Sequence, residues 1–272
     1  MARERVLIAV KTYPVLSQKH IELVCTAGFR EDGSWIRIYP SPFRFLEDQH
    51  RYSKYQWIEL DLKRNLKDPR PESYSPTNID EIELGDTMDT ARAWEDRRKF
   101  ILNNNTIYTN LSQAIAGPKS NQFSFAIFKP KKILGFKVED APRDWEASRK
   151  QAAEASLQQG SLFEENDRSD FKLVRKLPYK FSYQIEDDEG RKSTMMIEDW
   201  EIGQLYWNCL KNGDEKTAVQ KVREMYLDEI AKTKDVYLFL GTTLKFHQMN
   251  APNPYVIIGV FYPPHIQQLS LL

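Results

Sequence analysis

The sequence predicts an α+β protein made of two small β-barrel-like halves with inserted and interleaved helices. Three observations support this fold class. Runs rich in β-branched and aromatic residues, bounded by turn residues, dominate the start of the chain. Segments with helical spacing follow them, and a second set of strands and helices fills the second half. Such grouping of strands and helices is typical of α+β proteins.

The first strands are expected to form a strongly twisted sheet that closes into a small barrel. The strand-like runs lie at residues 5–13, 20–29, 35–40 and 55–62. Asp32-Gly33 separates the second run from the third, and this dipeptide favours a tight hairpin because glycine readily adopts positive φ. Residues 63–76 hold three prolines and are predicted to be a loop.

The middle of the chain alternates between helix and strand. Helical patterns lie at 87–105, 109–117 and 144–160, and a strand interrupted at Pro130 lies at 123–140. In the second half we expect a hairpin over 171–199, helices over 198–212 and 214–234, and strands over 235–247 and 254–262. The predicted organisation is an N-terminal half at 1–140, a helix and linker at 141–170, and a C-terminal half at 171–272.

The composition restricts the class of protein. Of the 272 residues, 41% are hydrophobic and 12% aromatic, which indicates a folded chain. Lys+Arg and Asp+Glu balance at 39 each, which argues against an overall basic surface but is compatible with a local basic groove. Two cysteines without CxxC spacing fit a reducing compartment and predict no zinc site. We found no signal peptide or membrane-spanning run, and we expect a cytoplasmic protein.

Basic and aromatic residues on the predicted strands form candidate nucleic-acid-binding surfaces. Barrels that bind single strands use a basic groove and flat aromatic rings on which bases stack. The candidates are Trp35, Arg37, Tyr39, Arg70, Lys131, Lys132, Lys172, Arg175, Lys176 and Lys180. Trp35, Arg37 and Tyr39 share one strand face because side chains alternate along a strand. The alternative is that Trp35 is a core residue and that the lysines guard a sheet edge.

Residues 24–40, VCTAGFREDGSWIRIYP, resemble a signature of the dual-OB domain family of bacterial conflict systems. In that family a Cys-x-Ala-Gly strand precedes a Gly-Trp-Ile-Arg hairpin. Here Cys25, Ala27 and Gly28 fit, and so do 35–37, whereas Ser34 separates Gly33 from the tryptophan. The resemblance implies two OB-like barrels and a role around nucleic acids or nucleotide ligands.

Signs of catalysis are weak. The four histidines lack metal-binding spacing, and no phosphate-binding glycine loop or nucleophile elbow is present. Glu198, Asp199 and Glu201 either stabilise a helix start or hold magnesium for phosphodiester cleavage. Residues 68–73, DPRPES, and 241–243, GTT, are further candidates for lining a site. No cofactor or metal ligand set is predicted.

The last five residues, QLSLL, resemble the bacterial sliding-clamp-binding pentapeptide, which reads Gln, Leu, Ser or Asp, Leu, then Phe or Leu. The residues are Gln268, Leu269, Ser270, Leu271 and Leu272. An extended peptide of this kind docks through its backbone while its apolar side chains fill a pocket. The alternative is that the leucines fold onto the protein. A partial match, QGSLF, contributes Gln159, Leu162 and Phe163 in the predicted linker region.

Two functions follow from these features. The first is a protein that binds nucleic acid, with single-stranded DNA as the expected partner, and associates with the sliding clamp in DNA maintenance or defence against phages. The second is a metal-dependent nuclease or another enzyme that acts on DNA or nucleotides. We expect Trp200 and Trp207 to be mostly core and Glu198 or Asp199 to stabilise the helix start, which favours the first function.

Overall fold

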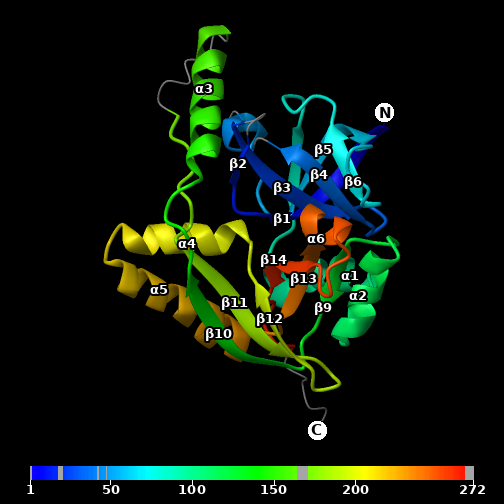
Figure 1. Cartoon of the computed structure of the whole chain (residues 1–272). Coiled ribbons are helices and arrows are strands. Elements are labelled where there is room, and N and C mark those ends of the chain that lie inside the picture. Colours follow the sequence, from blue (N-terminus) through cyan, green and yellow to red (C-terminus); the bar gives the residue numbers. More distant parts are fainter. Residues whose placement is uncertain (1, 18–20, 42, 47, 164–170, 267–272) are drawn as a thin grey trace.

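The computed structural model describes residues 2–17, 21–41, 43–46, 48–163 and 171–266 (Figure 1). The α+β class is confirmed, because a closed barrel near the N-terminus is followed by two further sheets with helices packed against them. None of the helices in these ranges is long and apolar enough to cross a lipid bilayer.

Five strands close the N-terminal barrel. They are β1 (Ala2–Lys11), β3 (Ile21–Arg30), β4 (Trp35–Ser41), β5 (Gln56–Arg64) and β6 (Ser73–Pro76). The order is β1-β3-β4-β6-β5, and β5 pairs back with β1 from Leu62↔Ala2 to Trp57↔Leu7. Aliphatic side chains such as Val6, Ile36 and Leu60 fill the interior. β2 (Val15–Ser17) and β7 (Glu83–Thr87) add to β3 and β5. Two 3-10 turns, η1 (Phe43–Phe45) and η2 (Asp48–His50), follow β4.

The prediction of an irregular loop over 63–76 is wrong at its end, where β6 closes the barrel. β6 pairs in parallel with β4 through Arg37↔Ser73 and antiparallel with β5 through Leu62↔Pro76. Pro76 is tolerated because it is the last residue of the strand, where a missing N–H costs little. The preceding prolines hold residues 65–72 as the predicted loop.

The second part of the chain forms two sheets. One has the order β14 (Tyr255–Phe261), β13 (Tyr237–Thr242), β9 (Phe125–Phe128), β8 (Ile107–Tyr108). The other has the order β10 (Lys132–Asp140), β11 (Tyr179–Glu186), β12 (Lys192–Met196). A bridge between Ile197 and Ile257 joins them. Strands from before residue 140 thus pair with strands from after residue 171, and the predicted domain limits stay a prediction.

Helices pack against the barrel and these two sheets, with α3 beside β2 of the barrel (Figure 1). They are α1 (Ala91–Asn103), α2 (Leu111–Lys119), α3 (Ala147–Phe163), α4 (Trp200–Leu210), α5 (Glu215–Arg223), the π-helical η3 (Glu224–Ala231) and α6 (Leu244–Gln248). Several element ends differ from the prediction. The strand expected over 235–247 ends at Thr242, and Leu244–Gln248 form helix α6. α2 continues past Gly117, whose added Cβ would lie 2.0 Å from the Phe123 ring, so this glycine serves packing. α3 continues past Gly160 to Phe163 and includes the backbone of QGSLF, whose side chains lie outside the described residues.

The barrel and the second part pack through aromatic side chains. Phe29 and Trp35 of the barrel contact Phe125 and Phe239 of the β14–β8 sheet, with Trp35 stacked on Phe125 at 4.8 Å between ring centres. This apolar interface holds the two parts together, and a cavity lined by its members Phe125, Val256 and Ile258 lies beside it.

Candidate nucleic-acid interface

A cleft of about 270 Å³, here called the basic cleft, lies between the barrel and helix α4. Its main side chains are Tyr13, Arg44, Lys172, Arg175, Trp207 and Lys211. The segment from Lys172 to Arg175, which was predicted to bind nucleic acid, forms part of its wall. A cleft that combines cations with aromatic rings is the arrangement that single strands require.

Helix α4 supplies one wall of the basic cleft. Its contributions at Trp200, Gln204, Trp207 and Lys211 recur every three or four residues and therefore share one face. The opposite face, which includes Tyr206, is buried in the core. The prediction that Trp200 and Trp207 are mostly core is confirmed in part, since both are half-buried and pack against the core while they also line the cleft.

Arg175 and Trp207 form the centre of the basic cleft. The Arg175 guanidinium lies 3.8 Å from the centre of the Trp207 ring. The Trp207 Nε1 donates a hydrogen bond to the Tyr13 hydroxyl at 2.7 Å, and that hydroxyl donates to the Arg175 carbonyl at 2.8 Å. Arg175 makes no ion pair with a carboxylate among the described residues, so its charge is available to a phosphate.

Arg44 has a structural role in the basic cleft. It donates to both carboxylate oxygens of the buried Glu22 at 2.7 and 2.6 Å, and to the Lys172 carbonyl at 3.0 Å. Burial raises the pKa of Glu22, whereas Arg44 and the Val174 N–H oppose this rise. Glu22 therefore offsets the charge of Arg44, and Lys172, Arg175 and Lys211 supply the net positive charge of the cleft.

The other predicted basic residues are distributed over different surfaces. Lys176 lies next to the cleft segment, where its Nζ donates to the Asp144 carbonyl at 3.3 Å. Lys180 is exposed on β11. Lys131 and Lys132 line a separate hollow of about 570 Å³ that shares no lining residue with the basic cleft.

The predicted face of Trp35, Arg37 and Tyr39 does not form an open groove, because the β14–β8 sheet covers it. Trp35 packs in the aromatic interface, and Arg37 is only 1% exposed. Tyr39 is half-buried, and Arg70 is 6% exposed. Sequence reasoning placed arginines on a surface because buried arginines are rare.

The acidic group before helix α4 stabilises the helix start. Asp199 accepts from the Glu201 N–H at 3.2 Å, as an N-cap does, and from the Lys54 Nζ at 2.9 Å. Glu201 accepts from the same Nζ at 2.8 Å. Burial raises the pKa of Asp199, and Lys54 counteracts this rise. Within the described ranges no group of three His, Cys, Asp or Glu side chains is placed to hold a metal ion.

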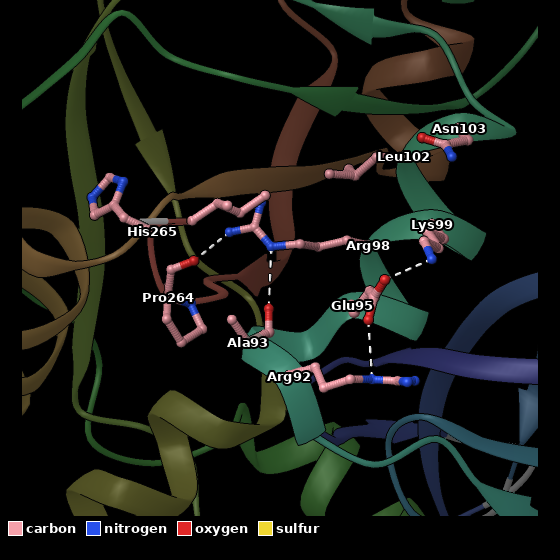
Figure 2. Close-up of a pocket in the computed structure, with 10 residues that line it drawn as sticks. Arg92, Ala93, Glu95, Arg98, Lys99, Leu102, Asn103, Pro264 and His265 are labelled. Carbon is pink, nitrogen blue, oxygen red and sulfur yellow. Dashed lines mark hydrogen bonds and ion pairs between the residues drawn. The ribbon is translucent and has the colours of Figure 1, made fainter. Parts of the chain in front are cut away.

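A wide hollow of about 790 Å³ lies between α1 and the chain that leaves β14 (Figure 2). Figure 2 shows Arg98 reaching the carbonyls of Ala93 and Pro264. Arg98 also donates to Asp235 at 3.0 Å. Lys99 and Arg92 pair with Glu95 on the same helix, so the cations of this hollow are largely neutralised.

Arg98 thus fixes the chain at Pro264, shortly before the predicted clamp-binding motif. The motif itself, residues 268–272, lies outside the described residues, and Ile266 before it is 69% exposed.

Comparisons with known proteins place the chain in a family. Residues 104–272 match the model described as "Domain of unknown function (DUF8757)", and residues 2–103 match "Domain of unknown function (DUF8758)". The chain belongs to the DUF8757 family, whose model matches more than half of it. No curated protein matches the sequence. One solved structure with detectable similarity is described as "Structure of murine DNA binding protein bound with ds DNA". It is 9% identical to this chain, with a TM-score of 0.31, and the match covers 99% of this chain and 100% of that chain.

Proposed function

We propose that the protein binds single-stranded nucleic acid in the basic cleft. The observation that carries this proposal is the Arg175–Trp207 pair, which places a cation without a carboxylate partner among the described residues against an aromatic ring. A phosphate contacts Arg175, Lys172 and Lys211, while a base stacks on the aromatic wall of the cleft. The predicted resemblance to dual-OB proteins supports the same class of function.

Fluorescence anisotropy with a labelled single-stranded oligonucleotide tests this proposal over a range of salt concentrations. In Lys172→Ala/Arg175→Ala we expect weaker binding. The slope of the logarithm of the binding constant against the logarithm of the salt concentration should become shallower by about 0.7 for each phosphate that the variant no longer neutralises. Trp207→Leu should weaken binding by about 1–3 kcal/mol, because a base can no longer stack on the indole ring. Lys119→Ala/Lys221→Ala is the matched control, because it removes two exposed charges that do not line the cleft. Unchanged affinity in the folded cleft variant would refute the proposal.

The same binding reactions address the enzyme alternative. Labelled single- and double-stranded DNA are incubated with the protein, with and without magnesium or manganese. Metal-dependent products favour a nuclease, whereas salt-sensitive retention without products favours a binding protein. The engagement of Asp199 with Lys54 and the α4 N-terminus favours the binding protein.

We further propose that the C-terminal motif at 268–272 binds a bacterial sliding clamp and brings the cleft to replicating DNA. The support is the five-residue match together with the fixed chain at Pro264 before it. QGSLF is the weaker candidate, because its backbone lies in α3 and would have to unwind to dock as an extended peptide. Calorimetry with a peptide of residues 266–272 tests the proposal, with an expected Kd of about 1 μM.

A further inference from the structure

A second cavity, here called the central cavity, lies between the barrel and the second part of the chain. It has a volume of about 210 Å³. Cys25, Arg37 and Tyr39 of the barrel strands and Arg70 of the loop between β5 and β6 line one side, and residues 241–243 line the other. In Figure 1 α6 lies beside the barrel, and the Arg70 Nη1 donates to the Thr242 carbonyl at 2.6 Å across this junction. Two regions that the sequence singled out, DPRPES and GTT, therefore meet at one cavity.

Arg37 is the central group of this cavity. Its Nη1 donates only to neutral hydroxyls, to Ser73 at 3.1 Å and to Ser124 at 2.9 Å. Its Nε is buried and has no hydrogen-bond partner within the described part of the chain. The guanidinium lies 4.1 Å from the Phe125 ring centre. A buried cation without a bonded carboxylate is costly, so an anion beside it would be stabilising.

The nearby carboxylates are already occupied. Asp68 accepts from the Arg70 Nε at 2.8 Å and Nη2 at 2.6 Å, and from the Ser73 hydroxyl at 2.8 Å. Glu72 accepts from the Ser124 N–H and hydroxyl, each at 2.7 Å. Neither carboxylate makes a direct hydrogen bond to Arg37 in the described structure.

The pKa values agree with a positive potential in the cavity region. Burial and then the charge of Arg70 lower the pKa of Arg37 to about 10. Burial, followed by the charges of Arg70 and Arg37, also lowers the pKa of His247, whose Nδ1 lies 3.4 Å from the Thr242 hydroxyl. A bound oxyanion beside Arg37 would oppose this lowering, because an opposite charge favours the charged form of the guanidinium.

The other residues that line the cavity indicate the chemistry of the rest of the ligand. Leu23, Phe125, Leu244, Val256 and Ile258 line the cavity with apolar surface. Glu198 lines it as well, and burial raises the pKa of its carboxyl. The volume lies below the roughly 300–1,000 Å³ of sites for drug-sized ligands, so the ligand is small.

We propose that the central cavity binds a small organic anion, whose phosphate or carboxylate group is held by Arg37, while Arg70, which is already paired with Asp68, forms the adjoining wall. The apolar body of the ligand packs against Val256 and Ile258. This proposal does not rest on nucleic-acid binding, although Tyr13 lines both the central cavity and the basic cleft.

Thermal unfolding with phenyl phosphate, benzoate and inorganic phosphate as separate probes tests the proposal. We expect phenyl phosphate or benzoate to raise the melting temperature of the wild type by several degrees, and inorganic phosphate to raise it less. The first two probes distinguish a phosphate ligand from a carboxylate ligand. Arg37→Lys keeps the charge but loses the planar guanidinium, and its affinity should fall about tenfold.

A second variant and a second measurement keep the test independent of how well Arg37→Lys folds. Val15 lines the cavity and is 48% exposed, so we expect Val15→Trp to fill space at the exposed edge of the cavity at little cost to the fold and to abolish the response. Cys25 also lines the cavity, so bound ligand should slow its alkylation in a Cys209→Ser background.

The proposal fails if none of the probes stabilises the wild type or protects Cys25. It also fails if Val15→Trp binds as tightly as the wild type, because the ligand then lies elsewhere. Lys172→Ala/Arg175→Ala should retain the full response, so a failure of nucleic-acid binding and a failure of this proposal are separable.

Discussion

The Trp207 indole N–H donates a hydrogen bond to the Tyr13 hydroxyl at 2.7 Å, across 194 positions of sequence. Tyr13 follows β1 of the barrel, and Trp207 belongs to α4 of the second part. The same hydroxyl donates to the Arg175 carbonyl, so one side chain ties the barrel, the helix and the basic segment together. The geometry of the basic cleft therefore depends on the contact between the two parts of the protein.

Tyr13→Phe removes both hydrogen bonds and leaves the Trp207 N–H without its partner. We expect a loss of about 1–2 kcal/mol in the free energy of unfolding, measured with urea, and weaker binding of single strands. Tyr108→Phe is the control, because its half-buried hydroxyl makes no hydrogen bond to a described residue. Equal stability of the two variants would show that the Tyr13 contact contributes nothing measurable.

Gly203→Ala probes the same contact by steric conflict. A Cβ at this position would lie 2.2 Å from Tyr13 Cδ2, and the ring is held in place by its hydrogen bonds. Alanine gains about 1 kcal/mol in helix propensity, whereas overpacking costs about 1–3 kcal/mol. We therefore expect a lower melting temperature. At Gly213 a Cβ meets only ordinary contacts at 3.5 Å, so Gly213→Ala should have little effect. A stabilised Gly203→Ala variant would mean that Tyr13 moves freely.

The local elements of the fold could be predicted from the sequence, since their signals are local. Asp32-Gly33 forms the predicted hairpin, with φ of 82° at Gly33, and Asn110 and Asp214 cap their helices. β6 was missed because it forms by pairing with Arg37, which lies 36 positions earlier, and no local pattern reports that contact.

The candidate site was only partly predictable for the same reason. The basic run at 172–176 identified one wall of the basic cleft. Arg44 and Tyr13 come from distant segments and carry no local signal. The helical spacing of Gln204, Trp207 and Lys211 could have indicated the other wall. These residues recur every three or four positions on α4, and two of them are polar, which indicates a face separate from the core.

Asp199→Asn should destabilise the protein without affecting nucleic-acid binding. Asparagine keeps the helix cap, but Lys54, whose side chain is 8% exposed, loses its most buried partner. Breaking such a pair costs about 3 kcal/mol, although Glu201 retains part of the attraction. Glu201→Gln, at a side chain 48% exposed, should cost less than about 1 kcal/mol. Chemical denaturation of both variants checks this order. Unchanged stability of Asp199→Asn together with loss of a nuclease activity would instead favour the enzyme alternative.

Asp68 makes stability depend on pH in the acid range. Burial opposes its ionisation, but the hydrogen bonds and charge of Arg70 outweigh burial and lower the pKa of Asp68 to about 2. Because the folded pKa lies below the unfolded value, this stabilisation is complete above about pH 4 and is lost as the pH falls towards 2. The free energy of unfolding of Asp68→Asn should be about 2 kcal/mol lower than that of the wild type at neutral pH, and it should fall less on acidification. Asp86→Asn, at an exposed position, should follow the wild type. Parallel curves for Asp68→Asn and the wild type would contradict this assignment.

Deletion of residues 268–272 should abolish most binding to a bacterial sliding clamp and leave the fold intact. The last strand ends at Phe261, and the chain is then anchored by the Asp235 N–H to the Pro263 carbonyl and by Arg98 to the Pro264 carbonyl. These interactions precede the deleted residues, so the melting temperature should not change. Leu271→Ala/Leu272→Ala should weaken clamp binding equally, because apolar side chains fill the pocket in this mode of recognition. Gln267→Ala, just outside the motif, is the control. If the truncated protein unfolds and the isolated peptide does not bind the clamp, the terminal leucines stabilise this fold and do not recruit a partner.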